Sequence, residues 1–403
     1  MESTTEKKPS DRLATRSSLD TAILFLVLGT AALIVWLSFT HRSDWAAHWP
    51  DYRHLLSNLP EPSAWLRWVL GDISEVAFYK HEFASIGLLA GAYLAYWANR
   101  TGKSWQGFAI SYGSGLWPWL VTSSLLGLVL SNLLWGWTVT ADSWQPTFAA
   151  FVSLPAAMVL MFGSGWKVTI NGAILGAVLV TPMCLLMVNY VCNPLALPVV
   201  IGNVSGMAIA SVLAFLLCRY VPSLVKSASS SQPPEPAAET APAKTPDYGV
   251  TWSLRRVLAD FSEAPFYGNE WASLGLILGA LLAFTLNPLS PVYGSALLPQ
   301  LIGAQALTSA VGVVIWRRQW MSLGWYPTYV PLVSVVPAAV LTYGGTWPVI
   351  VMSALLGALI APPLACAIAK RLPADMHGFI GNVLSMAIST LLIIPFIGFL
   401  IAN

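Results

Sequence analysis

Long apolar segments separated by short polar connections occupy most of the chain. The first covers residues 21–39, and the others follow at 83–99, 113–136, 146–164, 169–191, 197–219, 271–287, 294–315, 327–345, 348–369 and 378–402. A helix needs about 20 mostly apolar residues to cross the hydrocarbon core of a bilayer. The pattern therefore predicts an all-α polytopic membrane protein with about 11 transmembrane helices.

Positively charged residues indicate how these helices are oriented. The connections at 100–103, 167, 219–256, 317–318 and 370–371 carry Lys or Arg, whereas those at 138–142, 192–196, 287–294 and 344–346 carry neither. Cytoplasmic loops are enriched in Lys and Arg, and long outer loops, such as residues 40–82, are less restricted in charge. We therefore expect a multi-pass protein of the plasma (inner) membrane, with its N-terminus in the cytoplasm and its C-terminus outside.

Polar segments divide the chain into units. Residues 1–19 are expected to form a cytoplasmic tail, and residues 20–66 the first transmembrane helix with an outer loop. Residues 221–252 include a run rich in Ser, Pro, Ala and Glu that cannot form a core, so we expect a disordered cytoplasmic linker there. Five predicted spans precede this linker, in residues 67–220, and five follow it, in residues 253–403.

The two five-span units are related in sequence. Residues 67–99 read RWVLGDISEVAFYKHEFASIGLLAGAYLAYWAN, and residues 255–287 read RRVLADFSEAPFYGNEWASLGLILGALLAFTLN. Further similarities link 112–118 to 293–299, 153–159 to 334–340 and 201–211 to 380–390 in the same order. Because each unit has an odd number of spans, the second must enter the membrane from the opposite side. We therefore expect a 1 + 5 + 5 arrangement with two inverted-topology repeats, as in many alternating-access carriers and some passive channels.

Composition narrows the classes of function. The chain is 56% hydrophobic and only 9% charged, with a net charge of +2 and no basic stripe, which excludes a soluble globule and a nucleic-acid-binding protein. Its four Cys lack the spacing of a disulfide framework or a zinc site, so no metal site is expected. The sequence contains no phosphate-binding G-x-x-x-x-G-K-[ST] motif and no plausible Ser–His–Asp set, so neither an ATPase nor another enzyme is expected.

An acidic motif, D-x-S-E-x-x-F-Y-x-x-E, begins both units. If the motif is helical, its carboxylates and its tyrosine lie on one face. Carboxylates near hydrocarbon take up protons near neutral pH, which makes this face a candidate for coupling to H⁺ or Na⁺. The candidate coupling or gating residues are Glu82, Glu270, Glu75, Glu263, Tyr79 and Tyr267. The alternative is a helix in the membrane interface with a solvated acidic face. We prefer that alternative for Asp72, Glu75, Asp260 and Glu263, and prefer function for Glu82 and Glu270, which adjoin the spans.

Polar and proline positions within the spans form a second set of candidates. The motif I-G-N-V-x-x-M-A-I contains Asn203 in one unit and Asn382 in the other, and it fits either a broken helix lining a site or close packing with one interhelical hydrogen bond. Proline interrupts matching spans at Pro182 and Pro363, for a site or for packing alone. Two glutamines in one span have no counterpart in the first unit and are candidates for substrate contact: Gln300 and Gln305.

These features predict a secondary active transporter that moves a small polar or amphipathic solute by alternating access, with H⁺ or Na⁺ as its coupling ion and no other cofactor. The spans contain almost no Lys or Arg, which disfavours a strongly anionic substrate. One alternative is a passive channel for a small neutral solute, which would need a polar ladder along its pore. Another is a non-transporting subunit of a membrane complex that docks through the Pro-rich linker. The expected partners are the lipid bilayer and a small molecule, and a homo-oligomer is compatible with the sequence.

Overall fold

The computed structural model of the protein describes residues 49–59, 61–140, 146–225 and 248–402, and this part is all-helical, without strands. The predicted first span, residues 21–39, lies outside the described residues, as does most of the predicted linker. We call the described residues before the linker the first half and those after it the second half.

The helices of the first half are α2 (Tyr52–Ser57), α3 (Pro62–Ser74), α4 (Glu82–Arg100), α5 (Trp117–Trp135), α6 (Leu154–Phe162), α7 (Trp166–Leu175), α8 (Thr181–Met187) and α9 (Val199–Tyr220). Those of the second half are α10 (Val250–Asp260), α11 (Glu270–Leu286), α12 (Leu298–Ile315), α13 (Arg317–Leu323), α14 (Val335–Tyr343), α15 (Trp347–Ala369) and α16 (Phe379–Ala402). Single helical turns precede two of them: η4 (Thr147–Ala150) before α6 and η9 (Val330–Val333) before α14.

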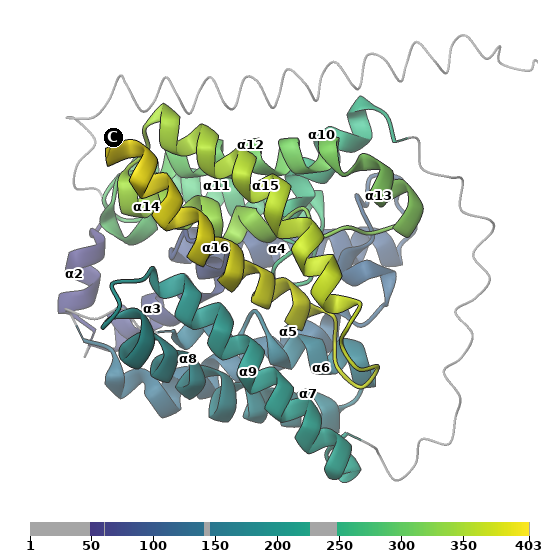
Figure 1. Ribbon diagram of the computed structural model, residues 1–403. Helices are drawn as coiled ribbons and strands as arrows, with labels where there is room; N and C mark the ends of the chain where they lie inside the picture. Colours follow the sequence, from purple (N-terminus) through teal and green to yellow (C-terminus); the bar gives the residue numbers. More distant parts are fainter. Residues whose placement is uncertain (1–48, 60, 141–145, 226–247, 403) are drawn as a thin grey trace, which may run out of the picture.

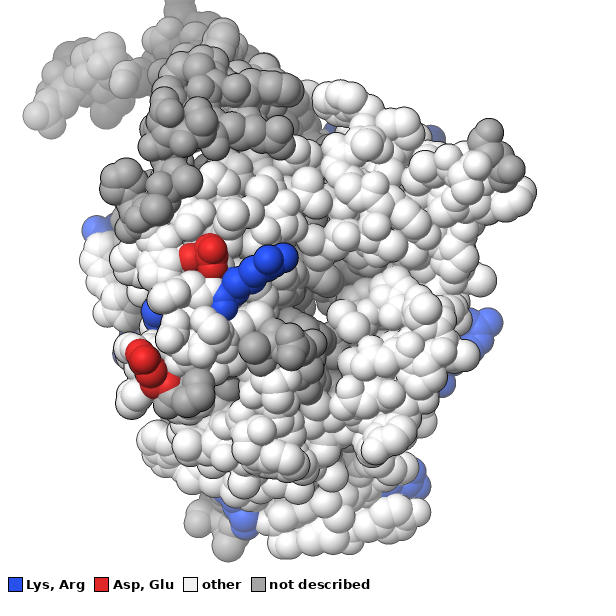
Figure 2. Space-filling view, turned by 90° about the vertical axis from the view of Figure 1, so that its left-hand side faces the viewer, with Lys and Arg blue, Asp and Glu red and all other residues white. Residues whose placement is uncertain are grey.

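Six helices are long and apolar enough to cross a membrane, which supports a multi-pass membrane protein. They are Trp117–Thr138, Trp166–Cys192, Val199–Tyr220, Leu298–Ile315, Trp347–Ala369 and Phe379–Ala402. Three shorter apolar helical segments coincide with further predicted spans: Thr147–Phe162, Glu270–Leu286 and Val330–Tyr343. The face drawn in Figure 2 carries few charged side chains, as a surface in contact with lipid requires.

The acidic motif that begins each unit is not one continuous helix. In the first half α3 ends at Ser74, the chain turns through Phe78 with φ of 69°, and α4 begins at Glu82. The second half turns in the same way, with φ of 64° at Phe266. The expectation that the acidic side chains share one helical face is therefore wrong. The outer loop predicted at 40–82 also contains helices, α2 and α3.

Matching hydrogen bonds hold the two turns. The Ser74 hydroxyl accepts from the His81 amide at 3.0 Å, and the Ser262 hydroxyl accepts from the Asn269 amide at 3.1 Å. The side chains of His81 and Asn269 cap the helix that follows each turn. His81 accepts a hydrogen bond from the Phe83 amide, and Asn269 accepts one from the Trp271 amide. These side-chain bonds satisfy amides that the helix starts leave without a partner, and so they stabilise a break in mid-motif.

Helices α4 and α11 cross at the centre of the molecule at backbone distance (Figure 1). A Cβ atom added to Gly87 would overlap the carbonyl group of Gly275, and one added to Gly275 would overlap the carbonyl group of Gly87. Gly91 and Gly279 are equally close to backbone of the opposite helix. The contact is therefore reciprocal, and each central glycine faces the residue that matches it in the other unit.

The other helices gather on either side of this crossing. Helices α5–α9 lie in the lower part of Figure 1 and α12–α16 in the upper part. Helices α9 and α16, which carry the matching I-G-N-V motifs, contact each other and run in opposite directions, because α9 begins on the side where α16 ends (Figure 1). The space beside them, facing η4 and η9, is where the two halves enclose a cavity.

We predict that Gly87→Ala lowers the apparent stability by about 1–3 kcal/mol, because the new methyl group forces the two backbones apart. Thermal unfolding of the purified protein in detergent measures the change. Gly303→Ala in α12 is the matched control, since no atom lies within 4 Å of the added Cβ, and its midpoint should stay close to wild type. Equal effects of the two substitutions would contradict the close crossing.

Candidate functional site

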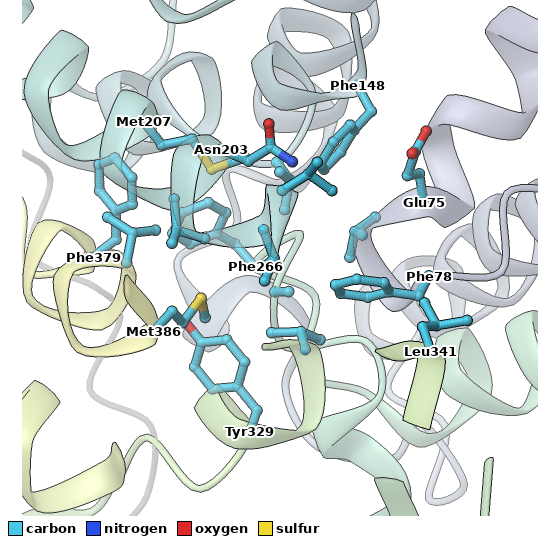
Figure 3. Close-up of a pocket in the computed structure, with 18 of the residues that line it drawn as sticks. Glu75, Phe78, Phe148, Asn203, Met207, Phe266, Tyr329, Leu341, Phe379 and Met386 are labelled. Atoms are coloured by element: carbon cyan, nitrogen blue, oxygen red, sulfur yellow. The ribbon is translucent and has the colours of Figure 1, made fainter. Parts of the chain in front are cut away.

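A cavity of about 290 Å³ lies between the two halves. Several of its lining residues occupy matching positions of the two units. Figure 3 labels three such pairs, Phe78 and Phe266, Phe148 and Tyr329, and Met207 and Met386. Val204 and Val383 form a fourth. The polar groups on its wall come from Glu75, Asn203, Tyr293 and Tyr329. The cavity is thus largely apolar, with a few polar groups at defined places, as small-molecule sites usually are.

The helices turn one face to the cavity because small residues let the other face pack closely. On α9 the lining residues Val200, Asn203 and Met207 follow helical spacing. On its other side Gly206 lies against α8, where an added Cβ would be 2.6 Å from the Cα of Cys184. Close packing of α8 on α9 therefore orients Asn203 and Met207 toward the centre.

A first buried charge cluster, cluster 1, lies at the turn between α3 and α4. The Lys80 ammonium pairs with Asp72 and lies 2.6 Å from Glu75 Oε2, and it also sits 3.5 Å from the centre of the Trp68 ring. The second Asp72 oxygen accepts from the Thr147 hydroxyl at 2.7 Å. All three charged side chains are buried, with Lys80 only 2% exposed.

Cluster 2 occupies the matching turn between α10 and α11. The Arg256 guanidinium lies 2.8 Å from Asp260 Oδ1 and 2.6 Å from Glu263 Oε2. Asp260 also accepts from the Ser309 hydroxyl at 2.6 Å, and Glu263 from the Trp325 indole at 2.8 Å. Arg256 is 4% exposed, so this cluster too is shielded from solvent.

The two clusters obtain their cation from different positions, because Lys80 lies within the acidic motif and Arg256 lies four residues before it. Lys80 corresponds to Gly268 in the second unit, and Trp68 corresponds to Arg256. Both Lys80 and Gly268 have positive φ, and a Cβ at Gly268 would overlap a Glu263 oxygen, so glycine is the residue that fits beside this carboxylate. The two units thus share the pair of carboxylates, but the basic residue that pairs with them occupies a different position in each unit.

Burial corrects two expectations. Asp72, Glu75, Asp260 and Glu263 are not on a solvated interfacial face, because each is at most 2% exposed and paired within its cluster. Buried basic residues are also present, at Lys80 and Arg256. Both residues lie outside the predicted spans, in the turns and helices beside them, so the charge pattern of the spans does not point to them. The sequence does contain a sign of these cations, because Trp68 and Lys80 correspond to Arg256 and Gly268, so each unit has one basic residue at these two positions.

In each cluster, as the described residues form it, one basic side chain pairs with two buried carboxylates. Ionised carboxylates are costly to bury, and pairing with a cation offsets part of that cost. Glu75 is the member that also reaches the cavity wall, where its Oε1 accepts from the Tyr293 hydroxyl at 3.2 Å.

Glu82 and Glu270, the preferred coupling candidates from sequence, have a different setting. Glu82 pairs with Arg67 at 2.6 Å, and Glu270 pairs with Arg255 at 2.7 Å. Each carboxylate begins a helix, where it also interacts favourably with the helix dipole. Neither lines the cavity. Each of these carboxylates therefore has an arginine of its own, whereas the carboxylates of each cluster share one basic side chain.

The tyrosines of the motif differ between the halves. The Tyr79 hydroxyl donates to Gln305 Oε1 at 3.0 Å, and the Gln305 amide donates to the carbonyls of Ala77 and Leu332 at 3.1 and 3.2 Å. Gln305 therefore links the two halves and does not line the cavity. Ser124 occupies the matching position of the first unit, and within the described chain neither its hydroxyl nor that of Tyr267 has a hydrogen-bond partner.

The two motif asparagines also differ. Asn382 Nδ2 donates to the Tyr329 hydroxyl at 2.9 Å. Asn203 lines the cavity, and its Oδ1 has no hydrogen-bond partner among the described residues. The remaining candidates Gln300, Pro182 and Pro363 lie within helices outside the cavity wall. Of the second set of candidates, Asn203 is thus the one on the cavity wall.

We predict that Lys80→Met lowers the stability by about 3–5 kcal/mol, since it leaves two buried carboxylates without their cation. Thermal or denaturant unfolding of the purified protein measures the loss. Arg219→Met is the control, because its pair with Asp375 is exposed at 3.4 Å and contributes at most about 1 kcal/mol.

The different position of the basic residue in the two clusters suggests a rescue experiment for Lys80→Met. The double substitution Trp68→Arg with Lys80→Gly copies the arrangement of cluster 2 into cluster 1, and we expect it to be more stable than Lys80→Met. A double variant no more stable than Lys80→Met would contradict the equivalence of the two clusters.

Comparison with known proteins adds no family to this description. The sequence matches no protein-family model, and it matches none of the curated proteins. Function must therefore be inferred from the cavity and the charge clusters themselves.

Proposed function

We propose that this protein is a secondary active transporter in which two inverted repeats alternate in opening a central cavity to either side of the membrane. The observation that carries the proposal is the cavity between the halves, lined by matching residues of both units, with a buried carboxylate on its wall. Two related halves around one site have two packings of similar energy, which is the physical basis of alternating access.

The reciprocal crossing of α4 and α11 supports the repeat arrangement. A residue contacts its own counterpart only near an axis that relates two equivalent bodies, as in isologous interfaces. Gly87 and Gly275 are counterparts and contact each other. The opposite directions of α9 and α16 (Figure 1), together with the alternation of basic and non-basic connections, favour the inverted 1 + 5 + 5 topology over two parallel copies.

The position of Glu75 supports coupling to a cation. A proton or Na⁺ bound at Glu75 adds positive charge to a cluster that holds two buried carboxylates at the edge of the cavity. Loading the cavity and loading this site are then energetically linked, because Glu75 belongs to both. We therefore assign coupling to Glu75, with Glu263 as its counterpart, ahead of Glu82 and Glu270.

A passive channel agrees less well with this geometry. A pore for a small neutral solute needs a continuous ladder of polar groups, whereas aromatic, aliphatic and Met side chains dominate the wall of this cavity. The linker on which a docking role would depend lies outside the described residues. We accordingly keep the transporter as the proposed function.

The test measures coupled movement in proteoliposomes that contain a pH-sensitive dye and carry a pH gradient, with small amphipathic solutes added outside. We expect at least one solute to change the internal pH in wild type. Glu75→Gln should keep uptake of that solute and lose the pH change, since the amide removes the titrating group.

Glu82→Gln is the comparison variant, and it should keep the pH change because Glu82 is compensated by Arg67. Repeating the assay with choline in place of Na⁺ separates the two coupling ions. A Glu75→Gln protein with a wild-type pH change and a wild-type Na⁺ response would rule out coupling at this residue.

A further inference from the structure

We propose that the cavity binds a small uncharged amphipathic molecule, whose polar group bonds to the Asn203 amide and whose apolar part lies between the aromatic and Met side chains. This inference rests on the proposed function only in identifying the cavity as the substrate site.

The first observation is the unsatisfied amide on the cavity wall. Asn203 is 3% exposed, and its Oδ1 has no hydrogen-bond partner among the described residues. A buried polar group without a partner costs about 1–3 kcal/mol. A ligand that supplies a hydroxyl or amide at this point removes that cost, and an asparagine side chain serves such a group either as donor or as acceptor.

The second observation is the counterpart that is already satisfied. Asn382 donates to the Tyr329 hydroxyl at 2.9 Å, and the residue matching Tyr329 in the first half is Phe148, which has no hydroxyl. Both Phe148 and Asn203 line the cavity, and Figure 3 draws them on the same side of it. The Tyr329 hydroxyl therefore satisfies the Asn382 amide, whereas Phe148 offers no hydroxyl and leaves the Asn203 amide available to a ligand.

The remaining wall determines the apolar part of the ligand. Phenylalanines and methionines of both halves surround the space: Phe78, Phe148, Phe266, Phe379, Met207 and Met386. Methionine adapts its shape to varied apolar surfaces. The cavity of about 290 Å³ equals roughly ten water molecules in liquid volume, which suits a ligand with one ring or a short chain.

Charge excludes the alternatives. An anion would face the Glu75 carboxylate on the cavity wall. A primary ammonium would need several acceptors, but the Glu75 oxygens already accept from Tyr293 at 3.2 Å and lie 2.6 Å from Lys80. An uncharged head group is the one that the available amide satisfies.

The experiment compares benzyl alcohol, benzoate and benzylammonium, which share one ring and differ in head group, on the purified full-length protein. Ligand binding to the folded state raises the unfolding temperature in a saturable way. We expect benzyl alcohol to stabilise wild type and the two charged probes to bind at least tenfold more weakly. Asn203→Leu should lose the benzyl alcohol effect by at least tenfold, which also controls for action of the probe on detergent.

Exchanging Phe and Tyr at positions 148 and 329 tests the role of the hydroxyl group that Phe148 lacks. Phe148→Tyr supplies a hydroxyl to Asn203, so it should raise the unfolding temperature without ligand and weaken benzyl alcohol at least tenfold. Tyr329→Phe removes the partner of Asn382, so it should lower the unfolding temperature and keep benzyl alcohol binding.

Equal binding of a charged probe, unchanged benzyl alcohol binding in Phe148→Tyr or Asn203→Leu, or no saturable stabilisation of wild type by benzyl alcohol would each overturn the inference. These outcomes do not depend on transport. Binding as expected without movement in proteoliposomes would contradict the proposed function alone, whereas coupled transport that is insensitive to Asn203→Leu would contradict this inference alone.

Discussion

The backbone contact between α4 and α11 is the constraint on which the rest of the structure depends. It requires glycine at the crossing, since any side chain at Gly87 or Gly275 would occupy the space of the opposite carbonyl group. Because each helix follows directly on an acidic turn, the crossing sets the position of both charge clusters. The cavity lies between the two halves that this contact joins.

A few sequence differences between matching positions distinguish the two halves. The cation of the acidic turn comes from Lys80 in one half and from Arg256 in the other. The Tyr329 hydroxyl accepts a hydrogen bond from Asn382, whereas Phe148 has no hydroxyl to offer Asn203 on the cavity wall. Lys80 and Gly268 differ greatly in size but share a positive φ, and Phe148 and Tyr329 differ by one hydroxyl group. In the binding site proposed above, one asparagine is satisfied by the protein and the other is available to a ligand.

Much of the helical architecture could be predicted, and parts of the site could not. The apolar segments predicted at 113–136 and 378–402 contain the helices α5 and α16, because length and apolarity leave no other structure in a membrane. The spacing of the acidic motif fits a helical face, but the chain breaks there because two serines, Ser74 and Ser262, bond across the turn. Spacing along a chain contains no information on such a bond.

The amino-acid sequence by itself determined that the protein is apolar and helical, that it contains two related units, and that Asn203 and the paired acidic residues merit attention. Only the tertiary structure decided which of those residues act together. The sequence favours Glu82, which adjoins a span, over Glu75, but in the structure Arg67 pairs with Glu82, whereas Lys80 is shared between Glu75 and Asp72. Asn203 and Asn382 are identical in their motifs, yet one faces Tyr329 and the other the cavity. The physical reason is that charge balance and hydrogen-bond satisfaction depend on neighbours brought together by packing.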